Sequence, residues 1–109
     1  MTIYNKLIRD RIPEIIQESE GECVVEVLTE QDYLKELQRK SQEELNEYLA
    51  ASNSNEAIEE LADLLEVIYG LTKCHGFSIE DLERVRQHKA DKRGVFDKKL
   101  FLVEVRKKE

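Results

Sequence analysis

The sequence has few residues that interrupt regular structure and few that bind zinc. One proline and four glycines occur in 109 residues, so turns are sparsely marked along the chain. There are two cysteines, Cys23 and Cys74, and neither belongs to a C-x-x-C pair or a Cys/His cluster. A structural zinc site is therefore not expected.

Long apolar runs are also missing. No stretch approaches the ~20 apolar residues that span a membrane. Residues 1–16 lack the apolar run and small-residue cleavage site of a signal peptide. We therefore expect a cytoplasmic protein with reduced thiols and no membrane association.

Basic charge is scarce except near the C-terminal end. Residues 1–83 carry 20 acids and 7 bases, whereas residues 84–109 carry 4 acids and 10 bases. The net charge of −7 makes non-specific binding of DNA or RNA a poor expectation. A basic region beside an acidic one suits a small polyphosphate with its metal ions. Charge alone fits equally well with two regions that neutralise each other within the fold or across a dimer.

The remaining pattern predicts a single, mainly α domain over residues 1–109. Four helices are expected, near residues 12–20, 29–51, 55–75 and 78–94. Ser78 and Asp81 resemble a capping box at the start of the last helix. Two runs rich in β-branched and apolar residues, 23–28 and 100–105, predict strands that pair into a small β element.

Two pairs of carboxylates stand out on the two long helices. They read E-x-x-E at Glu44 and Glu47, and E-x-x-D at Glu60 and Asp63. The i,i+3 spacing puts both members of a pair on one helix face. The same spacing recurs in Glu56/Glu59, Asp63/Glu66 and Glu80/Glu83, so spacing alone equally fits a solvated acidic face.

Position relative to the apolar stripe separates these pairs. At ~100° per residue, Glu44 falls at the edge of the apolar arc that contains Leu37, and Glu60 falls between Val67 and Leu71. Glu47 and Asp63 lie on the same flanks. Three other acidic residues face away: Glu43, Glu59 and Glu66.

An ionised carboxylate in an apolar interface needs a partner, because leaving it unpaired costs on the order of several kcal/mol. A salt bridge from Lys40 would meet that need, but a metal ion shared by four carboxylates is the favoured interpretation. His75 and His88 are not spaced with these acids, so the ligands are all oxygen. That set favours Mg²⁺ or Mn²⁺, and Mg²⁺ usually binds together with substrate phosphates.

Basic residues on the last helix provide a possible phosphate contact. Lys89 and Arg93 continue the stripe of Ile79, Leu82 and Arg86, where they could meet phosphate oxygens. Another basic patch near the N-terminus consists of Lys6, Arg9 and Arg11. For each of these residues the alternative is that the stem covers the core while the charged end reaches water.

These residues resemble the MazG-like all-α nucleoside triphosphate pyrophosphohydrolases, and most closely the small phosphoribosyl-ATP pyrophosphohydrolase-like proteins. The matching motifs are K-x-x-E-E-x-x-E from Lys40, E-E-L-A-D from Glu59, the N-terminal YNKLIRDRIPEII, and K-x-x-x-R-G-x-F from Lys89. Together they cover nearly the whole chain.

The resemblance implies an antiparallel helical bundle that forms a homodimer or homotetramer. It also implies Mg²⁺-dependent cleavage of the α–β phosphate bond of a nucleoside triphosphate, which gives a monophosphate and pyrophosphate. The implied catalytic metal ligands are Glu44, Glu47, Glu60 and Asp63. The implied phosphate contacts are Lys40, Lys89 and Arg93.

Three functions remain open on the sequence. The first is nucleotide-pool house-cleaning by hydrolysis of triphosphates. The second is the phosphoribosyl-ATP step of histidine biosynthesis, and the third is a non-enzymatic helical module for dimerisation or docking.

Overall fold

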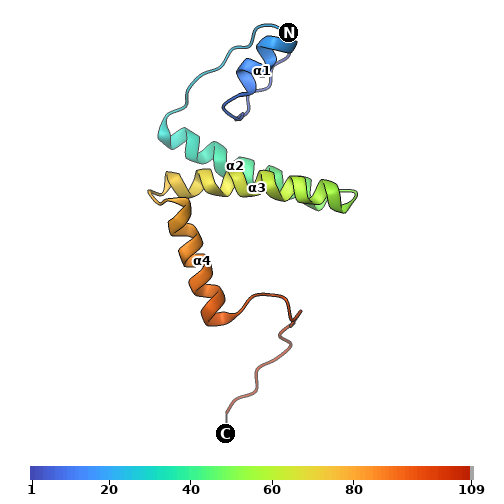
Figure 1. The fold of residues 1–109 in the computed structure, drawn as a ribbon, viewed down its shortest axis with the longest axis vertical. Coiled ribbons are helices and arrows are strands. Elements are labelled where there is room, and N and C mark those ends of the chain that lie inside the picture. The colour runs from blue at the N-terminus through green and yellow to red at the C-terminus, as the bar shows by residue number, and fades with distance from the viewer. Residues whose placement is uncertain (109) are drawn as a thin grey trace. The chain divides into compact units, whose positions relative to one another are not determined.

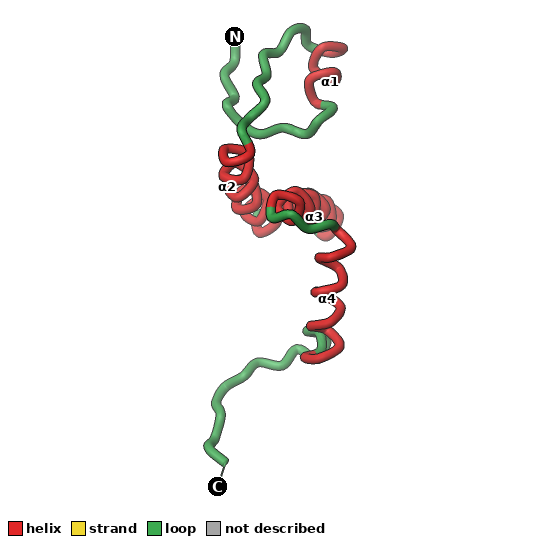
Figure 2. The backbone as a smooth tube through the Cα atoms, turned by 90° about the vertical axis from the view of Figure 1, so that its left-hand side faces the viewer, coloured by secondary structure: helices red, strands yellow, loops and turns green. Residues whose placement is uncertain are grey.

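The structure, a computed structural model, describes residues 1–108, and its regular structure there is entirely helical (Figures 1 and 2). The helices are α1 (Ile12–Ser19), α2 (Glu30–Leu49), α3 (Ser54–Cys74) and α4 (Ile79–Arg93). The chain divides into two compact units, one covering Met1–Phe77 and the other beginning at Ser78. The first unit therefore contains α1, α2 and α3, and the second contains α4.

The long helices begin where polar side chains bind their free amide groups. The Asp32 amide donates to Thr29 Oγ1 at the start of α2 (3.2 Å), and the Glu56 amide donates to Asn53 Oδ1 at the start of α3 (2.9 Å). Ser78 and Asp81 form the predicted capping box of α4. These caps explain why the observed helix boundaries lie close to those predicted from the sequence.

The α2–α3 pair is an antiparallel hairpin joined by residues 50–53. The two helices pack directly on each other (Figure 1). Gly70 of α3 lies against Leu37 of α2, so a Cβ at this glycine would sit only 3.2 Å from Leu37 Cδ1. Leu37 and Val67 are the buried apolar residues of the described chain. The absence of a side chain at Gly70 thus lets the helices approach closely at their small core.

Much apolar surface of the hairpin remains exposed. Leu49 and Ile58 are 70% and 63% exposed, close to the connection between the helices. Three further leucines on the hairpin are also exposed: Leu45, Leu61 and Leu65. Two helices cover only part of each other's apolar arc, so side chains predicted to face inward remain in contact with water.

The expectation of a mainly α fold is confirmed, but the predicted two-stranded β element is wrong. Neither 23–28 nor 100–105 forms a strand in the described part of the chain (Figure 2). Val24, Val27 and Leu100 are 86–100% exposed. β-branched residues favour a pleated, half-buried surface, and a strand requires a partner to complete its hydrogen bonds. These segments lack such a surface, so their composition alone does not make them strands.

Candidate metal centre

Three of the four predicted carboxylate ligands converge across the α2–α3 hairpin. One carboxylate oxygen from each of Glu44, Glu47 and Glu60 lies within 4.8 Å of the others. Glu44 and Glu47 project from one face of α2, and Glu60 comes from the facing part of α3. The antiparallel pairing brings them together because all three lie within about two turns of the connection between the helices.

Two carboxylate oxygens in this cluster are buried without a hydrogen-bond partner. They are Glu44 Oε2 and Glu60 Oε2. Glu44 is only 6% exposed, which makes it the one buried polar residue of the described chain. Buried polar atoms are normally paired, so these two oxygens are positioned for a ligand that the polypeptide does not supply.

The cluster opposes its own ionisation. Burial raises the pKa of the Glu44 carboxyl above its ordinary value, and the charge of Glu47 raises it further, while Lys40 acts in the opposite direction. Burial also raises the pKa of the Glu60 carboxyl, and the close approach of Glu47 and the charges of Asp63 and Glu44 raise it further. Both groups thus lack enough positive charge around them to hold two full negative charges.

Lys40 supplies part of that charge. Its Nζ lies 3.7 Å from Glu44 Oε1 and 3.5 Å from Glu43 Oε1. The salt bridge considered from the sequence therefore exists, but it leaves Glu44 Oε2 unpaired. A lysine shared between two acids does not neutralise three clustered carboxylates.

Asp63 lies at the edge of the cluster and has a basic partner of its own. Its charge contributes to the raised pKa of both Glu44 and Glu60. Its Oδ1 accepts a hydrogen bond of 2.7 Å from Arg9 Nη2, in the segment that precedes α1. The sequence places Arg9 in a basic patch, but no local pattern connects Arg9 to Asp63, because the two residues are 54 positions apart.

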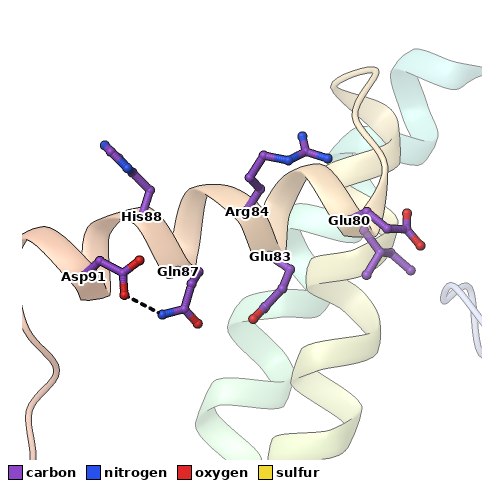
Figure 3. A pocket seen from close by; sticks show the side chains of 7 residues that line it. Glu80, Glu83, Arg84, Gln87, His88 and Asp91 are labelled. Carbon is purple, nitrogen blue, oxygen red and sulfur yellow. Dashed lines mark hydrogen bonds between the residues drawn. The ribbon is translucent and has the colours of Figure 1, made fainter.

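The other predicted phosphate contacts belong to the second unit. Lys89 and Arg93 lie on α4 and are exposed. A shallow hollow also runs along α4, lined by residues that include Glu80, Glu83 and Arg84 (Figure 3). There Arg84 pairs with Asp81, and the Gln87 amide donates to Asp91. Arg84 and Asp91 of this hollow thus have local partners, whereas the α2–α3 cluster leaves two carboxylate oxygens without one.

The α2–α3 residues fit a hard divalent cation. Their donor atoms are all carboxylate oxygens, which suit Mg²⁺ or Mn²⁺ better than zinc or iron. A cation would supply the missing partner for the orphaned Glu44 and Glu60 oxygens. It would also relieve the repulsion that opposes their ionisation.

Comparison with protein families gives a match over most of the chain. A model of the phosphoribosyl-ATP pyrophosphohydrolase family matches residues 4–90. This range contains α1, α2 and α3, every carboxylate of the cluster, and Arg9. Neither the curated proteins nor the solved structures gave a match. None of the helices in residues 1–108 is both long and apolar enough to cross a membrane.

Proposed function

Because the chain belongs to the phosphoribosyl-ATP pyrophosphohydrolase family, we propose that it is a Mg²⁺-dependent nucleoside triphosphate pyrophosphohydrolase. Family membership itself makes the chain a divalent-metal-dependent hydrolase of phosphoric anhydride bonds, within the MazG-like all-α superfamily. We propose further that it cleaves the α–β phosphate bond of a triphosphate in nucleotide-pool house-cleaning. The products would be a monophosphate and pyrophosphate.

The observation that supports this proposal is the pair of orphaned oxygens, Glu44 Oε2 and Glu60 Oε2, beside Glu47. A cluster kept only for structure would be expected to pair its buried oxygens internally. Negative charge that the protein's own residues leave uncompensated favours a ligand of opposite charge. A divalent cation that carries a polyphosphate meets that requirement.

Each carboxylate has a role that follows from its position. Glu44, Glu47, Glu60 and Asp63 would hold the cation, which supplies positive charge to the phosphate oxygens and makes a nearby water more acidic. Glu47 is the most exposed member of the three-residue cluster, so it is the one best placed to accept a proton from the attacking water. Lys40, beside Glu44, would keep the cluster from repelling the incoming phosphates.

Phosphoribosyl-ATP is the second candidate substrate, and the family match is the observation that favours it. Its hydrolysis breaks the same α–β bond, so the carboxylate roles would be unchanged. The two candidates differ in the group attached to the base. Binding of that group would involve residues outside the carboxylate cluster.

We also propose that the protein acts as a homodimer or homotetramer in the cytoplasm. The exposed apolar residues of the hairpin favour self-association, because a second copy would remove them from water. Cys23 and Cys74 are free thiols, which suits a reducing compartment.

A pyrophosphate-release assay over canonical and modified triphosphates and phosphoribosyl-ATP, with and without Mg²⁺, tests the proposal. We expect metal-dependent release of pyrophosphate from one triphosphate or a small group of them. Preference for phosphoribosyl-ATP would establish the second candidate instead. Release from none of them by the folded protein, with either Mg²⁺ or Mn²⁺, would overturn both.

A further inference from the structure

Arg9 reaches the edge of the carboxylate cluster from a distant part of the chain. Its Nη2 lies 2.7 Å from Asp63 Oδ1. The other ion pairs within residues 1–108 join residues at most four positions apart. The segment that precedes α1 thus places one guanidinium beside a predicted metal ligand.

Stability does not explain this contact well. The Arg9 and Asp63 side chains are 61% and 42% exposed. Exposed ion pairs contribute little to folding, because water screens them and both side chains lose freedom. The Arg9–Asp63 ion pair can therefore break at little cost in free energy, and Arg9 is accessible to a ligand from solvent.

We propose that Arg9 is a substrate-binding residue that contacts the phosphates of the nucleotide, and that Asp63 holds it beside the carboxylate cluster until the nucleotide binds. This inference rests on the proposed function. Once Asp63 binds the cation, the guanidinium loses its partner next to the metal-bound phosphates. Its planar set of donors can bind two phosphate oxygens at once, as it would a carboxylate.

If Arg9 has this role, its removal should change the affinity for metal and the affinity for phosphate in opposite directions. Without nucleotide, Arg9 competes with the cation for Asp63, so removing Arg9 should tighten binding of the metal alone by up to about fivefold. In the loaded protein Arg9 contacts phosphate, so removing it should weaken phosphate binding by about tenfold or more. A residue that only tethers the N-terminal segment would change both affinities in the same direction.

The test compares the full chain with Arg9→Ala, Arg9→Lys and the control Arg11→Ala. Arg11 lies two residues away and pairs locally with Glu14. Binding of Mn²⁺ alone is measured by electron paramagnetic resonance, and binding of inorganic pyrophosphate at saturating Mn²⁺ is measured by calorimetry. We expect Arg9→Ala to bind Mn²⁺ at least as tightly as the wild type and pyrophosphate at least tenfold more weakly, with Arg11→Ala unchanged.

Arg9→Lys keeps the positive charge and the pairing with Asp63, so it keeps the test decisive even where Arg9→Ala fails to fold. It should bind Mn²⁺ like the wild type and pyrophosphate more weakly. Wild-type pyrophosphate affinity in both Arg9 variants, or equal weakening of both ligands, would overturn the role of Arg9 alone. A wild-type protein that binds no Mn²⁺ would overturn the proposed function, and this inference with it.

Discussion

Glu44 of α2 and Glu60 of α3 each bury a carboxylate oxygen without a hydrogen-bond donor, on facing helices of one hairpin. Glu47 completes the cluster, with oxygens of all three residues within 4.8 Å of one another. One buried and one half-buried acid in this arrangement destabilise the metal-free protein whenever both are ionised. The site is therefore strained without its ligand, and a cation would both fill it and stabilise the hairpin.

The first prediction concerns the pH dependence of stability. The carboxyl pKa values of Glu44 and Glu60 are raised in the folded chain above the ordinary value of 4.5. Their stabilising contribution is therefore complete below that pH and is lost as pH rises through the folded pKa values. Without metal, thermal unfolding should show Glu44→Gln gaining stability over the wild type as pH rises from acidic to neutral.

At neutral pH and saturating Mg²⁺ the wild type should become more stable than Glu44→Gln, because metal binding stabilises the wild type and not the glutamine variant. Glu43→Gln is the matched control, since Glu43 is the adjacent acid and also pairs with Lys40. It should follow the wild type in both conditions. A constant difference between wild type and Glu44→Gln at every pH would contradict the assigned cause.

The second prediction concerns the close approach at Gly70. An added Cβ would lie 3.2 Å and 3.3 Å from the two terminal carbons of Leu37, which is itself only 5% exposed. Overpacking should outweigh the better helix propensity of alanine, so Gly70→Ala should destabilise the fold by about 1 kcal/mol in denaturant unfolding.

The sign of that effect depends on Leu37. In a Leu37→Ala background the same Gly70→Ala change meets only the Tyr33 hydroxyl, at an ordinary contact distance of 3.5 Å, and alanine should then stabilise α3 relative to glycine. A double-mutant cycle measures this reversal. Equal effects of Gly70→Ala in both backgrounds would show that the Leu37 contact is not what requires the glycine.

The third prediction concerns the basic residues of α4. The family resemblance implies that Lys89 and Arg93 contact phosphate, and on that proposal Lys89→Ala and Arg93→Ala should each raise the KM for the nucleotide by about tenfold. Neither should alter the binding of Mn²⁺ alone. Lys92→Ala is the control for loss of charge, because Lys92 lies in the last turn of α4 beside Arg93. A KM change as large in Lys92→Ala would reduce the role of Lys89 and Arg93 to general electrostatic attraction.

The fourth prediction concerns self-association. Ile58 and Leu65 are exposed on α3, and they would be covered by another copy of the chain. Ile58→Lys and Leu65→Lys should lower the apparent mass measured by light scattering, whereas Glu59→Lys, on the outward face, should not. A wild-type protein that is monomeric at all accessible concentrations would contradict the oligomeric proposal.

The sequence predicted the helical part of the fold well. Caps such as Thr29, Asn53 and Ser78 act within one helical turn, so local sequence is sufficient to position the helix starts. The position of Glu44 at the edge of the apolar arc could also be predicted, because it depends only on helical periodicity and the position of Leu37. Both are properties of neighbouring residues.

Interactions between distant segments could not be predicted in the same way. The apolar run at 100–105 has the composition of a strand, but composition does not supply the partner that a strand needs. The contact of Arg9 with Asp63 depends on where the N-terminal segment meets α3, and no spacing rule covers 54 residues. In both cases the deciding information lies in tertiary contacts.

Binding of Mn²⁺ to the wild type and to Glu60→Gln, measured side by side in the absence of nucleotide, tests the central claim most directly. Glu43→Gln and Glu59→Gln serve as controls, since each removes an adjacent outward-facing acid. The account predicts that Mn²⁺ binds the wild type and both controls, and that Glu60→Gln weakens binding by at least about tenfold. Equal affinity of Glu60→Gln and the wild type would show that the α2–α3 cluster is not the metal centre.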